Sequence, residues 1–179
     1  MKQVKKILAP VDLSKSSRAG LGLALSLAAE NAAELLVLHV AGNLQAWQML
    51  DENGFSDRIY KWEVDRIVRE AALDLHRFLE PHMEEIRRLP SARQKVVLGD
   101  AAEKIVEVAC GEESGLIVMS PRPYGPLRRF FAGSATDQVA RRAPCPVLSV
   151  CPAQVPRAGR GRRIPRVPLI GGILQGSEA

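Results

Sequence analysis

Five short apolar runs, separated by stretches with helical spacing, constrain the fold of this chain more than any other feature. The runs are Lys6–Asp12, Glu34–Val40, Lys95–Leu98, Gly115–Met119 and Pro146–Val150. An apolar run without polar alternation is typical of a strand that is buried on both faces. Because parallel strands need crossover connections, the alternation predicts one α/β domain with an open, doubly wound parallel sheet of five strands.

The segments between the runs carry the spacing and the end signals of helices. One apolar helix face is formed by Leu21, Ala24, Leu25 and Ala28. These positions follow the i, i+3, i+4, i+7 pattern, and we expect Ser14 or Ser17 to cap this helix. A long helix is expected over Val64–Leu79, and Pro81 should end or kink it, because proline cannot donate a helical hydrogen bond.

Two further helices have recognisable starts. Asp100 and Glu103 have the spacing of a capping box, which predicts a helix directly after the third apolar run. Gly133-Ser134 is expected to open the last helix, which continues through Arg142. In an open parallel sheet, ligands bind beyond the carboxyl ends of the strands, so the loop from Met119 to Ser134 is the expected functional centre.

Charge divides the chain into two parts. Residues 1–152 carry 20 Lys and Arg against 19 Asp and Glu, whereas residues 153–179 carry five Arg and one Glu. We therefore expect a folded domain over 1–152 and a basic tail over 153–179, rich in Pro, Gly and Arg, that is extended or disordered. Because the positive charge belongs to the tail, it does not make the domain a nucleic-acid binder, and binding of nucleic acid is not expected.

Neither a membrane protein nor a disulfide scaffold is expected. No apolar run approaches the roughly 20 residues that span a bilayer, and Lys5–Val11 fits a buried strand better than a signal sequence. Cys110, Cys145 and Cys151 form no CxxC pair, so we expect buried thiols rather than a disulfide framework or a zinc site. These features favour a soluble, cytoplasmic protein.

Several motifs in one order give residues 1 to about 152 a specific resemblance. They are Ile7–Asp12 followed by Ser14 and Ser17, Leu38–Val40, Gly99–Ile105, Gly115–Met119, Gly133-Ser134 and Arg142–Val150. In this order the chain resembles the universal stress proteins. The resemblance implies strand order 3-2-1-4-5 and a homodimer made through the last strand, at Val147, Leu148, Ser149 and Val150. It also implies a role in stress tolerance rather than a defined reaction.

The resemblance is incomplete at the phosphate loop. Family members that bind ATP carry Gly-x-x-Gly, nine residues and then Gly-Ser or Gly-Thr. Aligned on Gly133-Ser134, this chain has Ser120 and Pro123 in place of the two earlier glycines. Glycine lets a backbone approach a phosphate closely, whereas proline lacks an N–H donor and fixes φ. Losing one hydrogen bond to a charged group would weaken affinity about ten- to a hundredfold.

Site residues follow from the resemblance, position by position. It implies nucleotide contacts at Pro10, Val11, Asp12, Val40, Met119, Ser120, Pro123, Gly133, Ser134 and Ala135. In this alignment Asp12 contacts the nucleoside near the ribose and adenine, and Val40 contacts adenine through its backbone. Three arginines near the loop are possible phosphate contacts that would compensate for the lost glycines: Arg122, Arg128 and Arg129.

Three functions remain open on the sequence alone. The first is a non-catalytic regulatory protein whose ATP binding is weakened or lost. The second is an ATP binder with slow or no hydrolysis, in which Mg accompanies the nucleotide and no other metal is expected. The third is an adaptor that acts through the basic tail. Asp12 and Ser134 also suit simple turn or helix caps, and His39, inside an apolar strand, suits a packed histidine better than a catalyst.

Overall fold

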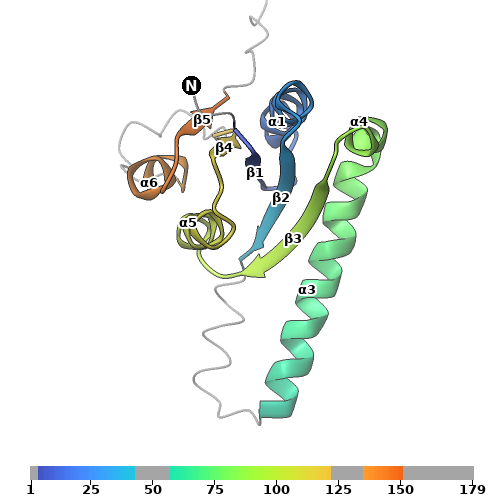
Figure 1. The fold of residues 1–179 in the computed structure, drawn as a ribbon. Coiled ribbons are helices and arrows are strands. Elements are labelled where there is room, and N and C mark those ends of the chain that lie inside the picture. The colour runs from blue at the N-terminus through green and yellow to red at the C-terminus, as the bar shows by residue number, and fades with distance from the viewer. Residues whose placement is uncertain (1–3, 43–56, 122–134, 151–179) are drawn as a thin grey trace, which may run out of the picture.

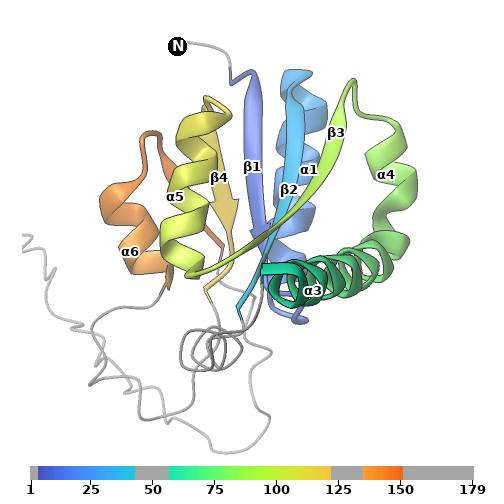
Figure 2. The same ribbon diagram turned by 90° about the horizontal axis from the view of Figure 1, so that it is seen from below.

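The computed structural model describes residues 4–42, 57–121 and 135–150, with the side chains of 57–61 excepted. Its centre is a five-stranded parallel sheet in the order β3-β2-β1-β4-β5 (Figure 1), which confirms the predicted sheet and its order. The strands are β1 (Lys6–Val11), β2 (Glu34–Ala41), β3 (Ala92–Leu98), β4 (Leu116–Met119) and β5 (Val147–Ser149). Figure 2 shows β1 to β4 side by side, and every paired strand of the sheet runs parallel to its neighbour.

Helices cover both faces of this sheet. They are α1 (Ser17–Asn31), α3 (Asp57–Leu79), α4 (Met83–Arg87), α5 (Ala101–Gly111) and α6 (Ala135–Arg142), with a 3-10 turn at Glu80–His82. One core cluster joins the sheet to α1 and the end of α3, and a second joins it to α5 and α6. Figure 1 shows these two helix groups on opposite sides of the sheet, as a doubly wound fold requires.

The strand pattern explains how one sheet serves two cores. In β1, Ile7 and Ala9 face the cluster with α1, whereas Leu8 faces the cluster with α5. In β2, Leu35 faces the cluster with α1 and Leu38 faces the cluster with α5, because side chains along a strand alternate between the two faces of the sheet. Each fully buried Leu or Ile stabilises the fold by about 1.5–3 kcal/mol. The continuous apolar runs therefore supply both cores.

The edge strand β3 is longer than the sequence predicts, beginning at Ala92 rather than Lys95. Its first four residues are exposed, because β3 lies at the edge of the sheet. Arg93 pairs with Glu34 at 2.6 Å and with Glu112 at 2.7 Å, and Lys95 pairs with Glu112 at 3.1 Å. Hydrogen bonds from Arg93 and Lys95 lower the pKa of Glu112 to about 2. A search for apolar runs does not find the start of β3, because ion pairs and not apolar contacts stabilise it.

Most helix ends follow the predicted signals, but α3 begins at Asp57, earlier than the predicted Val64. The Glu103 N–H donates to Asp100 Oδ1 at 2.9 Å, so Asp100 caps α5 as expected. The helix α3 ends at Leu79, just before Pro81. The N-cap of α1, however, is Ser16, between the two serines that the sequence suggests. Ser14 still contributes, because its Oγ accepts a bond from the Ser17 N–H at 3.4 Å.

Two other expectations have mixed outcomes. Cys110 is exposed and Cys145 is half-buried, so the prediction of buried thiols is wrong for Cys110. That residue is the tenth of the eleven in α5 and is not a member of the core cluster, whereas the preceding Val108 and Ala109 are. The tail 153–179 and Cys151 lie outside the described residues. Within the described ranges, no helix combines the length and the apolar composition that crossing a membrane requires.

Candidate functional site

A cleft of about 240 Å³ lies at the carboxyl ends of β1, β2 and β4, next to the first residues of α1, α5 and α6. Its lining residues are Pro10, Val11, Asp12, Ser17, Leu38, His39, Val40, Ala101, Ile105, Met119, Ser120, Ala135 and Thr136. The strand order reverses between β1 and β4, because β1 continues to β2 on one side while β4 lies on the other. The cleft is therefore at the switch point where open parallel sheets bind ligands.

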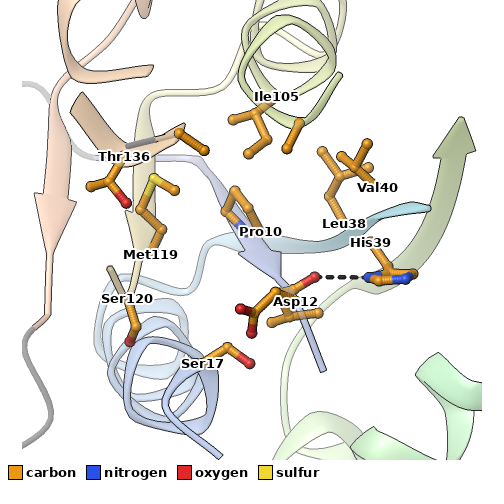
Figure 3. A pocket seen from close by; sticks show the side chains of 13 residues that line it. Pro10, Asp12, Ser17, Leu38, His39, Val40, Ile105, Met119, Ser120 and Thr136 are labelled. Atoms are coloured by element: carbon orange, nitrogen blue, oxygen red, sulfur yellow. Dashed lines mark hydrogen bonds between the residues drawn. The ribbon is translucent and has the colours of Figure 1, made fainter. Parts of the chain in front are cut away.

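The lining has an apolar side and a polar side. Figure 3 shows Leu38, Val40 and Ile105 together on one side, while Asp12, Ser17 and Ser120 gather on the other. An apolar slot beside a few polar groups is the usual design of a small-molecule site, in which the apolar walls bury a ring and the polar groups orient it. The arrangement therefore suits a ligand with a flat apolar part and a hydroxylated part.

Asp12 follows the last residue of β1, and its carboxylate is held in place by the turn. Asp12 Oδ1 accepts hydrogen bonds from the Ser14 N–H at 3.1 Å and from Ser14 Oγ at 2.5 Å. Leu13, between them, has a φ of 60°, a left-handed conformation that such a turn stabilises. The predicted turn-capping role of Asp12 is thus present, and the same bonds fix the carboxylate at the cleft.

His39 occupies the end of β2 beside Val11, its register partner in β1. The His39 Nδ1 lies 2.9 Å from the Val11 carbonyl oxygen (Figure 3). Because a carbonyl only accepts hydrogen bonds, Nδ1 must carry a proton and donate it. The ring therefore fastens β2 to β1 at the edge of the cleft. This contact agrees with the interpretation of His39 as a packed histidine.

Ser120, directly after β4, contacts α1. Its Oγ accepts a hydrogen bond from the Gly20 backbone N–H at 2.8 Å. A Cβ on Gly20 would lie 2.9 Å from Ser120 Oγ and 3.0 Å from Ser120 N, so only glycine permits this approach of helix and strand end. From the sequence alone, Ser120 is interpreted only as the residue that replaces the first glycine of the family's ATP motif. The structure adds that its side chain joins β4 to α1.

The structure brings together most of the residues that the resemblance assigns to the site. Around the cleft lie Pro10, Val11, Asp12, Val40, Met119, Ser120 and Ala135. The remaining assigned positions, Pro123, Gly133 and Ser134, lie outside the described residues, as do the possible phosphate contacts Arg122, Arg128 and Arg129. Six lining residues are not among the positions assigned from the sequence: Ser17, Leu38, His39, Ala101, Ile105 and Thr136. Leu38 shares a strand face with Val40, and Ala101 and Ile105 share a helix face, so spacing could have found three of them.

The described lining carries an acidic side chain and no Lys or Arg. The acidic side chain is that of Asp12. In the described part of the chain, no cluster of three or more His, Cys, Asp or Glu side chains is suited to hold a metal ion. The described cleft thus offers carboxylate and hydroxyl oxygens beside an apolar wall.

Comparisons with solved structures agree with this fold. The universal stress protein UspA from Lactobacillus plantarum matches with a TM-score of 0.63 and 22% identity, over 84% of this chain and 99% of that one. A universal stress protein in complex with cAMP matches at 0.61 and 16%, over 83% and 98%. The Archaeoglobus fulgidus protein in complex with dAMP matches at 0.52 and 18%, over 83% and 98%. At these identities the likeness shows the fold.

Comparisons of sequence establish the family. The universal stress protein YxiE of Bacillus subtilis is 28% identical over 148 residues, which are 81% of this chain and 97% of that protein. A Thermus aquaticus universal stress protein is 40% identical over 62 residues, 35% of this chain and 45% of the relative, so that alignment spans under half of its length. The family profile matches residues 3–150. The chain belongs to the universal stress protein family.

Proposed function

We propose that the cleft binds an adenine nucleoside or nucleotide and that the protein is a regulatory, non-catalytic stress-tolerance protein. The observation that carries the proposal is the fixed Asp12 carboxylate opposite an apolar slot. Carboxylate oxygens accept hydrogen bonds from sugar hydroxyls, and the slot between Val40 and Ile105 suits a purine ring. The two fold neighbours described as complexes with cAMP and dAMP are consistent with a ligand of this class.

The phosphate side is expected to be weak. Ser120 and Pro123 replace two glycines of the family's ATP motif, and Pro123 removes a backbone donor. The described lining offers no Lys or Arg to a triphosphate. We therefore expect weak or absent ATP binding, with Mg bound only as a companion of the nucleotide. Compensation by Arg122, Arg128 and Arg129 remains the alternative, and it predicts ATP binding with slow or no hydrolysis.

The non-catalytic role rests on the same lining. Phosphoryl transfer needs cations or metal ions that stabilise developing charge. The described lining has an acidic residue instead, and its histidine donates a hydrogen bond to the Val11 carbonyl. Such a cleft suits binding better than hydrolysis.

Mass spectrometry of the small molecules that the purified protein releases on denaturation tests the binding proposal. We expect an adenine nucleoside or nucleotide, and isothermal titration should show saturable binding of adenosine, AMP or ATP. Asp12→Ala should weaken that binding more than tenfold, because a hydrogen bond to a charged group is lost. Asp74→Ala, which removes an exposed carboxylate on α3, is the matched control. No released ligand and no titratable binding would overturn the proposal.

We also propose a homodimer through β5, because one edge of this strand is exposed. The strand β5 is the last of the sheet, so one of its edges has no partner strand in the described part of the chain. Leu148, in the middle of this strand, is 40% exposed. An exposed edge with an apolar side chain favours pairing with another chain. A second copy of this chain is the partner that the family resemblance implies.

A further inference from the structure

Two cysteines lie at the edge of the sheet opposite the cleft, where the strands begin. The helix α5 starts at the cleft with Ala101 and runs back to this edge, so Cys110 lies there in its last turn. The helix α6 also starts at the cleft, with Ala135, and the chain reaches the same edge at Cys145, two residues before β5. Figure 2 shows the end of α5 and the connection from α6 to β5 at one edge of the sheet. The fold thus brings two thiols that are distant in sequence to one edge.

The two cysteines also share one face of the sheet. Helices α5 and α6 pack against each other on this face, and β4 pairs with β5. Cys145 packs against the core cluster that includes Ala109, the residue before Cys110. The Ile117 N–H of β4 donates to the Pro146 carbonyl oxygen at 3.0 Å, so the residue after Cys145 is fastened to the strand that follows α5. The end of α5 and the start of β5 are therefore held beside each other by packing and by the sheet.

The two thiols differ in their surroundings. Cys110 is exposed, whereas Cys145 is half-buried, and both are free thiols in this structure. Burial, and next the negative charge of the Cys110 thiolate, raise the pKa of the Cys145 thiol. The second cause requires the two sulfur atoms to lie within electrostatic range of each other. An accessible thiol that meets an oxidant first, beside a more protected thiol, is the arrangement of a reacting cysteine and a resolving cysteine.

We propose that Cys110 and Cys145 are an oxidation-sensitive thiol pair that hydrogen peroxide converts into a disulfide. The peroxide oxidises Cys110 to a sulfenic acid, and its O–O bond breaks with release of one water. The Cys145 thiol then attacks the sulfenic sulfur, an S–S bond forms, and the sulfenic oxygen leaves as a second water. The two thiols together lose two electrons and two protons, and one peroxide is reduced to two waters. The bond joins the last turn of α5 to the connection before β5.

Peroxide oxidation of the full chain, read by intact mass spectrometry and by peptide mapping, tests the pair. In the wild type we expect the mass to fall by two hydrogen atoms, a peptide pair joined through Cys110 and Cys145, and reversal by a thiol reductant. Cys110→Ser and Cys145→Ser should each abolish this bond. Cys151→Ser, at the third cysteine, is the matched control and should keep it. A bond to Cys151, a bond between two chains, or no bond at all would overturn the proposal.

Trapping of the sulfenic acid separates the roles of the two cysteines. Dimedone should label Cys110 in the Cys145→Ser variant, because the sulfenic acid has lost its resolving partner, and should not label Cys145 in Cys110→Ser. Equal labelling of both residues would contradict the assigned roles. A disulfide needs Cα atoms about 4.4–6.8 Å apart, so a bond between two ends that the fold already holds together should leave the circular dichroism spectrum unchanged. A bond that forms only in urea would show that the folded chain keeps the thiols out of reach, and the proposal would fail.

Discussion

The hydroxyl of Ser120 accepts a hydrogen bond from the backbone N–H of Gly20 at 2.8 Å, across 100 residues of sequence. This contact joins the end of β4 to the first turns of α1 beside the cleft. A serine in place of a motif glycine is therefore a structural partner of a second glycine. Replacing Ser120 would change the packing of α1 as well as the chemistry of the loop.

The close approach at Gly20 gives a stability prediction. Gly20→Ala should destabilise the fold by about 1–3 kcal/mol, because the new methyl group would lie about 3 Å from Ser120 and from the main chain of Met119. Gly22→Ala in the same helix is the control. In the described part of the chain, no atom beyond its own helix backbone and chain neighbours lies within 4 Å of its added Cβ, so it should stabilise the fold by about 0.5–1 kcal/mol. Urea unfolding measures both, and equal effects would refute the packing argument.

The dimer proposal makes a prediction about two exposed leucines. Leu148→Asp should convert a dimer into a monomer in light scattering after gel filtration, because a charge on the edge strand opposes pairing. Leu73→Asp is the control, since Leu73 is 58% exposed on α3, away from β5. A wild-type monomer at micromolar concentration, or a Leu148→Asp variant that remains dimeric, would argue against pairing through β5.

The ion pairs at β3 predict a pH dependence. The pKa of Glu112 falls from 4.5 to about 2 in the folded chain, chiefly because Arg93 and then Lys95 donate hydrogen bonds to it. A lowered folded pKa gives stability that is present above about pH 4.5 and is lost as the pH falls toward 2. Glu112→Gln should flatten the acid branch of the unfolding curve. Glu113→Gln, at the exposed neighbouring residue, should leave that branch as it is in the wild type.

The cap of α5 predicts a local cost. Asp100→Ala removes the acceptor of the Glu103 N–H and should destabilise the fold by about 0.5–2 kcal/mol. Asp74→Ala should cost less than about 1 kcal/mol, because its exposed pair with Arg77 contributes little. Thermal unfolding of the two variants gives the comparison. A cost for Asp100→Ala no greater than for Asp74→Ala would mean that water replaces the cap.

Much of the fold could be predicted because its signals are local. The apolar runs predict β1, β2 and β4, and the capping pair Asp100 and Glu103 predicts the start of α5. The beginning of β3 could not be predicted in this way. Arg93 and Lys95 are stabilised there by Glu34 and Glu112, and such partners become neighbours only after the chain has folded.

One part of the candidate site could likewise be predicted from the sequence, and another part could not. The sequence by itself determined the parallel sheet, the family resemblance and the residues after each strand, because the period of hydrophobicity and the turn residues are encoded locally. Only the tertiary structure decided that Ser17 and Asp12 line one cleft and that Ser120 is fixed by Gly20. Hydrogen-bond direction depends on partners from distant segments, so it is decided by packing and not by spacing along the chain.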